Sequence, residues 1–282
     1  MQRQRPTPPL DRIAPVTYMR DMRTHFIVGL AVLSICTAGM VAAGAKDLTL
    51  RAKVTTGGPH AGTHEEMQYW TGNRMITDSP ETRIIVDLDA QTLTVIDKRA
   101  RTYFTQTAAE MRQQSDAMQA ELQKRMEQLP PQAREMMEKM HGGQAHGGAP
   151  LRVNATGKSE KIAGYQAAEY AIEGGPMNST VWASEALQPP GGAKAGEALA
   201  KMMSASGPGA RMGEALTQIK GIPLRMVMTS GMGPQAFTRT SEVVEVTEKA
   251  PPADVLTVPE GFKQAAPPSF DAVRGPRGAP RQ

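Results

Sequence analysis

Residues 83–105, RIIVDLDAQTLTVIDKRARTYFT, contain three short apolar runs separated by turns. The runs are rich in Ile, Val and Thr, residues that favour β-strands. Expected strands at Arg83–Leu88, Thr92–Ile96 and Arg101–Thr105 are joined by the turns Asp89–Gln91 and Asp97–Arg99. Because connections this short join only antiparallel neighbours, the stretch predicts an antiparallel meander.

The same kind of pattern continues toward both ends of the chain. Further expected strands are Leu48–Val54, Glu65–Trp70, Arg74–Thr77, Leu151–Thr156, Gln166–Ile172, Ser179–Ser184, Pro223–Thr229, Ala236–Val246 and Leu256–Val258, with a turn-rich segment at Gly157–Tyr165. Helical spacing is found at Ala108–Leu129, Gln132–Met140, Gly196–Met203 and Arg211–Lys220. Strands and helices that do not alternate regularly indicate an α+β fold with an antiparallel sheet.

We expect one domain at residues 46–264, with helical insertions at 108–140 and 194–220. The Gly-rich segment 141–150 is expected to be a linker between two halves of one sheet. Residues 265–282, rich in Pro, Gly and Arg, predict a disordered tail.

Residues 26–45, FIVGLAVLSICTAGMVAAGA, carry no charge and follow Arg20 and Arg23. With the small residues of Ala43–Ala45 at their end, they predict a cleavable export signal. The signal proper is expected at 22–45, preceded by an extension at 1–21, although the run is also long enough for a retained membrane anchor. The only cysteine, Cys36, lies in this leader. We therefore expect a periplasmic or secreted protein whose mature chain has no cysteine and no stable membrane span.

The charge distribution argues against a nucleic-acid partner. The chain has a formal charge of +4, but five Arg and two Asp precede residue 46, which leaves 27 of the 32 basic and 26 of the 28 acidic side chains for the rest. A nearly neutral body lacks the basic surface that binds phosphates. The polar side of the helix at Ala108–Leu129 carries charges of both signs.

Catalytic and cofactor motifs are missing from the sequence. No G-x-S-x-G, Walker A, G-x-G-x-x-G after a strand, or C-x-x-C is present. The segment from His64 to Met67 begins like a zinc-protease helix, but Gln68 stands where the second histidine belongs. Asp87, Asp89 and Asp97 lie at strand ends, where aspartate commonly accepts hydrogen bonds from turn amides. We expect neither an enzyme nor a cofactor.

The chain has 19 methionines and only 4% aromatic residues. Methionine packs adaptably around irregular apolar partners, so helices with Met on one face could cover a cavity for flexible hydrocarbon, although simple core packing explains them equally well. The residues expected to line such a cavity are Met111, Met118, Leu122, Met126, Trp70, Tyr103 and Trp182. A lipid or acyl chain is the expected ligand.

A second cluster of sulfur and imidazole groups suggests a different ligand. Met136, Met140, His141 and His146 lie close together in the sequence, and thioether and imidazole ligands suit copper. The alternative function is therefore periplasmic copper or metal binding through the segment 136–146.

A series of short segments resembles a known group of proteins. The segments are Thr71–Arg74, Ile84–Asp87, Val95–Asp97, Arg101–Tyr103, Thr156–Gly157, Ile162–Tyr165, Glu169–Tyr170, Val181–Ser184, Gly221–Leu224 and Val258–Lys263. They resemble bacterial secreted domains of unknown function related to the LolA/LolB/LppX/RseB-like lipoprotein-carrier superfamily. The resemblance implies an open antiparallel β half-barrel wrapped around helices, here Met-rich, with an apolar cavity. It also implies a lipid or lipoprotein acyl chain as ligand, or an envelope protein as partner.

Overall fold

The computed structural model describes residues 46–58, 61–130, 132, 151–174, 177–205, 210–230 and 237–267. Within these residues, twelve strands form one sheet in the order β12-β6-β5-β4-β3-β2-β1-β11-β10-β9-β8-β7. Its outermost strands, β12 and β7, are not paired with each other. The sheet is therefore open, as the half-barrel expectation requires.

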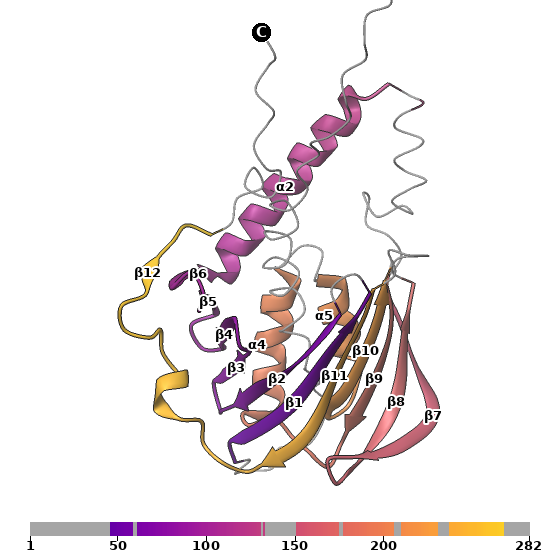
Figure 1. Cartoon of the computed structure of the whole chain (residues 1–282). Coiled ribbons are helices and arrows are strands. Elements are labelled where there is room, and N and C mark those ends of the chain that lie inside the picture. The colour runs from indigo at the N-terminus through magenta and orange to yellow at the C-terminus, as the bar shows by residue number, and fades with distance from the viewer. Residues whose placement is uncertain are drawn as a thin grey trace, which may run out of the picture.

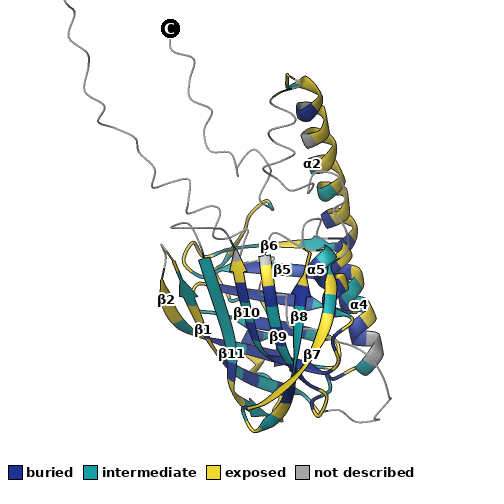
Figure 2. Ribbon diagram, turned by 90° about the vertical axis from the view of Figure 1, so that its right-hand side faces the viewer, coloured by how far each residue is buried: buried dark blue, intermediate teal, exposed yellow. Residues whose placement is uncertain are grey.

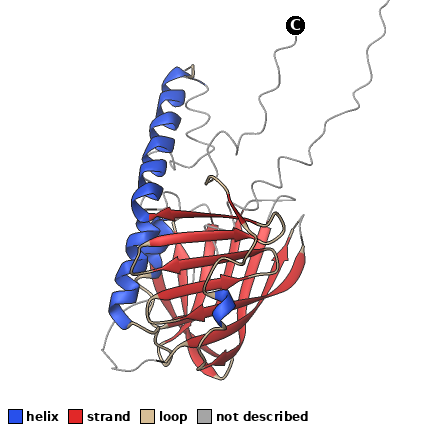
Figure 3. Ribbon diagram, turned by 90° about the vertical axis from the view of Figure 1, so that its left-hand side faces the viewer, coloured by secondary structure: helices blue, strands red, loops and turns tan. Residues whose placement is uncertain are grey.

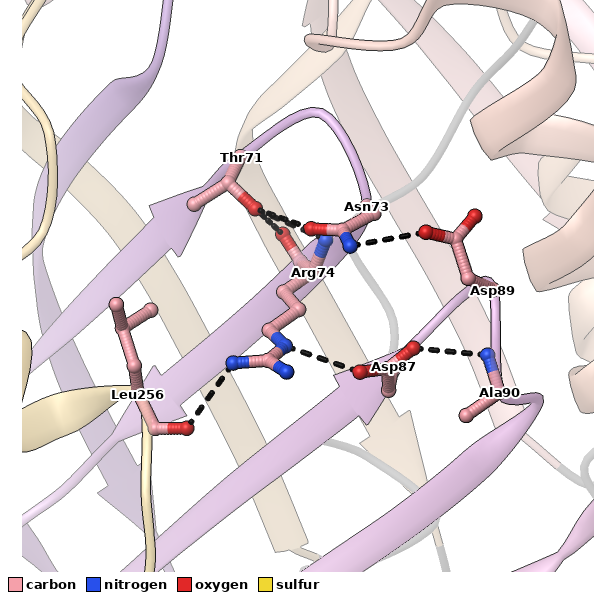
Figure 4. A network of polar contacts seen from close by, with 7 residues as sticks. All are labelled: Thr71, Asn73, Arg74, Asp87, Asp89, Ala90 and Leu256. Atoms are coloured by element: carbon pink, nitrogen blue, oxygen red, sulfur yellow. Dashed lines mark hydrogen bonds and ion pairs between the residues drawn. The ribbon is translucent and has the colours of Figure 1, made fainter.

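The first half of the chain forms the meander that the sequence predicts. Its strands are β1 (Leu48–Gly57), β2 (Gly62–Trp70), β3 (Arg74–Asp78), β4 (Thr82–Asp87), β5 (Thr92–Asp97) and β6 (Thr102–Thr107). Figure 4 shows how two of its turns are held. Asp87 accepts a hydrogen bond from the amide of Ala90 (2.9 Å), and Asn73 donates to Asp89 (2.9 Å). Asp97 likewise accepts from the amide of Ala100 (2.7 Å), so the expected turn role of Asp87 and Asp97 is confirmed.

The second half of the chain adds the rest of the sheet and the helices that cover it. The elements are β7 (Arg152–Ile162), β8 (Tyr165–Glu173), β9 (Met177–Ser184), α4 (Gly192–Ser204), α5 (Ala210–Leu216), β10 (Ile222–Ser230), β11 (Phe237–Thr247), the 3₁₀ helix η4 (Ala253–Val255) and β12 (Lys263–Gln264). Strand β11 pairs antiparallel with β1, with Leu50 opposite Val246. This long-range pairing joins the strands of the first half of the chain to those of the second half in one sheet (Figure 1).

The sequence prediction fails at two places in the sheet. The segment Gly157–Tyr165 is mostly strand, because a bulge between Ala155 and Ser159 lets β7 continue to Ile162. The connection to β8 is only Ala163 and Gly164, both with positive φ (47° and 90°), which matches a tight type I′ hairpin turn.

The second failure lies near the C-terminus of the described chain. Leu256–Val258 is not a strand but follows η4 as irregular chain. Only Lys263 and Gln264 join the sheet, and they pair parallel with β6. The sheet is consequently mixed rather than wholly antiparallel.

The longest described helix, α2 (Ala108–Gln128), begins where the sequence predicts. Thr107 accepts a hydrogen bond from the amide of Glu110 (3.1 Å), while the Glu110 carboxylate accepts from the amide of Thr107 (2.7 Å). This capping box fixes the helix start. Figures 1 and 2 show α2 leaving the sheet and extending beyond it. The expectation that this helix lies within the half-barrel is therefore corrected for all but its first turn.

The two faces of the sheet have separate apolar cores. We call the face that contacts α4 and α5 the inner face; its core includes strand residues from β1 to β10 together with residues of both helices. The outer face of β2–β6 has a smaller core of Tyr69, Ile76, Ile85, Ile96 and Val255. Figure 3 looks onto this outer face, with η4 lying across the strands. Strand alternation explains the division, because successive side chains point to opposite faces.

Candidate functional site

The inner face is covered by methionine side chains from two helices and one strand. Met202 and Met203 of α4, Met212 of α5, and Met226 and Met228 of β10 are all buried in the same core. We call these five residues the methionine layer. Figure 1 shows α4 and α5 lying against the sheet, and the five side chains belong to the core on that face. The methionine layer is therefore part of the contact between the inner face and its cover.

Local sequence explains why these side chains point inward. In β10 the buried residues Leu224, Met226 and Met228 alternate with Arg225 and Val227, which are only partly buried. In α4 the buried residues recur at helical spacing, at Ala195, Leu199, Met202 and Met203. Helix α5 approaches α4 closely at Gly213, where an added Cβ would overlap the side chain of Met203.

Strand β2 places polar side chains on the same inner face. His64, Glu66 and Gln68 pair with Val54, Ala52 and Leu50 of β1, and these three β1 residues are fully buried. Glu66 is 4% exposed and Gln68 is 5% exposed, and the amide of Gln68 donates to the Glu66 carboxylate (3.1 Å). We call His64, Glu66 and Gln68 the polar row.

Arg239 brings a positive charge to the polar row from a different part of the sheet. It lies in β11 opposite Thr56 of β1, while Glu66 lies in β2 on the far side of β1. Its Nη2 is 3.6 Å from the Glu66 carboxylate, and its side chain is 14% exposed. To reach Glu66 the side chain must therefore cross β1 on its inner face.

The environment shifts the pKa values of both basic groups. Burial lowers the pKa of Arg239, and the nearby Glu66 carboxylate opposes this shift. Burial also lowers the pKa of His64, with a further decrease from the positive charge of Arg239. Glu66 and Glu81 act in the opposite direction on His64 but do not outweigh these causes. His64 is consequently uncharged at neutral pH.

Several buried polar atoms on this face have no hydrogen-bond partner among the described residues. They are Gln68 Oε1, Trp70 Nε1 and Ser179 Oγ. Trp70 follows Gln68 on the inner side of β2, and Ser179 pairs with Met228 of the methionine layer. An unpartnered buried polar group costs free energy, so each of these atoms requires an explanation.

The structure brings together only some of the residues that the sequence indicated as cavity-lining. Trp70 and Met111 belong to the inner core. Tyr103 lies on the outer face with Ile96, because alternation in β6 places Phe104 inside instead. Trp182 is partly buried and packs against the inner core, and the Arg225 guanidinium lies 5.2 Å from its ring.

The remaining candidates lie on α2 beyond its first turn. Met118 is half-buried and Met126 is buried, but neither belongs to the inner core. The side chain of Leu122 lies outside the described part. The expectation that Met118 and Met126 lie together with Trp70 on the inner face is therefore corrected, because α2 leaves the sheet. Whether any of the candidates contacts a ligand stays a prediction.

Sequence reasoning missed the methionine layer as a site and the polar row altogether. The alternation of Leu224, Met226 and Met228 was a usable signal for the former. No local signal connects Arg239 with Glu66, because their proximity depends on the pairing of β11 with β1.

The expected metal ligands Met136, Met140, His141 and His146 lie outside the described residues. Among the described residues, no group of three or more His, Cys, Asp or Glu side chains is arranged to hold a metal ion. None of the helices in the described ranges combines the length and apolar character needed to span a bilayer. The predicted leader, linker and most of the predicted tail are also outside these ranges.

An open, curved sheet with an apolar, helix-covered inner face defines the class of this protein as a half-barrel. Residues 107–262 match the family model described as a domain of unknown function, DUF4412. Because this match covers more than half of the chain, the protein belongs to the DUF4412 family. The expectation that the chain contains a domain of unknown function is confirmed by this match. No curated protein matches its sequence.

The chain is also similar, at low sequence identity, to several solved structures. An uncharacterized conserved protein from Thermus thermophilus is 6% identical, with 88% of this chain and 98% of that chain covered and a TM-score of 0.40. A LolA superfamily protein from Nitrosomonas europaea is 6% identical, with 83% and 96% covered and a TM-score of 0.30. PNGF-II is 7% identical with a TM-score of 0.40; the match covers 82% of this chain but only 32% of PNGF-II.

Proposed function

We propose that this protein is an exported, non-enzymatic carrier that binds an apolar ligand, such as a lipid or a lipoprotein acyl chain, on the inner face of its sheet. The observation that carries the proposal is the methionine layer between α4, α5 and β10. Unbranched thioether side chains repack at low cost around different apolar shapes. Helices that pack on such side chains can therefore make room for a flexible hydrocarbon chain.

The distribution of methionine within the fold supports a ligand role over simple packing. The buried members of the outer core are Tyr, Ile and Val, residues with fewer accessible shapes. Methionine is concentrated instead where two short helices cover the inner face. The inner core thus combines buried methionines with branched apolar residues, whereas Met67 at the outer core is only partly buried.

The direct test is to isolate the protein after expression through the export pathway and analyse it by native mass spectrometry. A bound apolar molecule is expected, and organic extraction followed by rebinding should restore it. Purified protein that retains no ligand, and that also fails to bind the apolar dye phenylnaphthylamine, would contradict the proposal.

A matched substitution series connects this binding to the methionine layer. The triple change Met202→Leu, Met226→Leu and Met228→Leu conserves volume but replaces flexible side chains by branched ones. We expect narrower selectivity for chain length while the fold persists. Met67→Leu on the outer side of β2 is the control, because Met67 packs against the outer core; it should leave selectivity unchanged.

A further inference from the structure

The polar row and Arg239 form the least expected feature of an otherwise apolar inner face. Burying charged and polar groups is costly unless they are paired and hydrogen-bonded. Here the pairing is incomplete. The guanidinium of Arg239 has its ion pair to Glu66 at 3.6 Å, a separation beyond a good hydrogen bond.

The unused hydrogen-bonding capacity is specific. A guanidinium has five N–H donors, and among the described residues Arg239 has its ion pair to Glu66 but no hydrogen bond to an acceptor. Gln68 uses its amide N–H on Glu66, while its Oε1 has no partner in the described part of the chain. The site therefore offers free donors from Arg239 and a free acceptor from Gln68.

We propose that His64, Glu66, Gln68 and Arg239 form a subsite for the head group of a neutral amphiphile, an acyl chain that ends in a hydroxyl or an amide. This inference rests on the proposed function, because it supplies the polar end of the apolar ligand. A hydroxyl or amide both donates and accepts, so one such group satisfies Gln68 Oε1 and an Arg239 N–H together.

The charges of the subsite select against ionised head groups. Glu66 and Arg239 compensate one another, and His64 is uncharged at neutral pH. A carboxylate or phosphate would bring a second negative charge close to the buried Glu66, and a cation would be repelled by Arg239. A neutral polar group adds no uncompensated charge to the buried face.

The position of the subsite fits an amphiphile with its chain on the methionine layer. Met228 of that layer pairs directly with Arg239 across β10 and β11. Further along β2, Trp70 lies beside Leu48 and opposite Met75, all in the inner core. Polar groups at one side of the inner face thus adjoin continuous apolar surface, as a head group and its chain require.

The test compares ligands that share one hydrocarbon chain and differ only at the end. Oleyl alcohol, oleamide, oleate and octadecene each compete with phenylnaphthylamine for the purified full chain at neutral pH. We expect the alcohol and the amide to bind about five- to tenfold more tightly than octadecene and oleate, the effect of about one net hydrogen bond. Tighter binding of oleate than of oleyl alcohol would overturn the proposal that the subsite takes a neutral head group.

Two variants separate a head-group role from a structural one. Gln68→Met removes the free acceptor at similar volume and should abolish the preference for alcohol and amide while octadecene binds as before. The double change Glu66→Gln and Arg239→Met removes both charges together, so that no buried charge is left unpaired, and should have the same result. Met67→Leu on the outer face is the matched control, and it should keep the wild-type preference.

The outcomes distinguish the subsite from the function on which it depends. Equal displacement of the dye by all four ligands, or an unchanged preference in a folded Gln68→Met variant, would overturn the subsite and leave an apolar site in place. Displacement by none of the four would overturn the proposed function and with it the subsite.

Discussion

The two faces of the sheet are covered in different ways. On the outer face of β2–β6, the segment from η4 to β12 is fixed by directional bonds: Arg83 donates to the carbonyl of Asp254 (2.8 Å), and the amide of Lys263 donates to the carbonyl of Arg101 (3.0 Å). Arg74 reaches the carbonyl of Leu256 (3.5 Å), as Figure 4 shows. On the inner face, α4 and α5 meet the sheet chiefly through methionine and other apolar side chains.

Under the proposed function, this difference predicts which of the two covers makes room for a ligand. Directional hydrogen bonds require one geometry, whereas methionine packing tolerates several. We therefore expect the inner cover, and not the outer one, to move when a ligand binds. Four substitutions test this contrast, beginning with the largest expected effect.

Ile76→Ala should be the most destabilising change. Ile76 is 0% exposed in the outer core, where truncation leaves a cavity that rigid neighbours fill poorly. A loss of about 3 kcal/mol in the free energy of unfolding is expected, measured by urea denaturation. The same kind of truncation on the inner face, Met226→Ala, should cost less, about 2 kcal/mol, because its flexible neighbours can fill the cavity. Equal losses at the two positions would remove the contrast between the cores.

Arg83→Met should loosen the outer cover. It removes the bond to Asp254 and the ion pair to Asp78 (2.9 Å), although Asp78 keeps Lys98 at 2.7 Å. We expect about 2 kcal/mol of destabilisation and faster proteolysis within residues 250–262. Arg74→Met, at a side chain that is 35% exposed, is the milder comparison. Unchanged cleavage in Arg83→Met would show that apolar contacts alone hold this segment.

Gly213→Ala should disturb the inner cover. The new methyl group would overlap Met203, and the cost of overpacking should exceed the gain in helix propensity of about 1 kcal/mol, for a net loss of about 1 kcal/mol. Dye affinity should change with it. Gly62→Ala is the control, since nothing lies within 4 Å of a Cβ there. If Gly213→Ala leaves the stability unchanged, α5 moves freely away from α4.

The substitution His64→Gln should have the smallest effect on stability. It should be visible only in how the free energy of unfolding depends on pH. The pKa of His64 is lowered in the folded protein by burial and by Arg239, whereas the unfolded histidine titrates near about 6.5. Below that pH the unfolded state binds more protons, so the stability contributed by neutral His64 is lost as the pH falls and levels off once the folded histidine is also protonated.

The measurement is urea unfolding of wild type and His64→Gln between about pH 7.5 and about pH 5.5. The variant should lose less stability than wild type over this range. Parallel pH profiles for the two proteins would show that His64 does not titrate differently on folding.

Much of the fold was predictable from local pattern. The strands of residues 83–105 and their aspartate turns follow from alternation and turn chemistry, and the start of α2 follows from helical spacing. The errors arose where backbone geometry overrides residue type: Gly157 lets β7 pass through a bulge, and Leu256–Val258 covers a sheet face instead of extending it. Of the cavity-lining candidates, Trp70 and Met111 lie in the inner core and Trp182 packs against it, whereas Tyr103 lies on the outer face. Alternation within one strand does not tell which of its sides faces the helices, so the placement of Tyr103 was not predictable from sequence.

By itself, the sequence determined most of the strands, their order along the chain and the alternation of side chains within each one, since these depend on neighbouring residues. Only the tertiary structure decided that β11 pairs with β1, which side of the sheet α4 and α5 cover, and that Arg239 reaches Glu66. Alternation specifies which residues share a face of one strand but not which strands become neighbours. That choice depends on burial and backbone hydrogen bonding summed over the whole sheet.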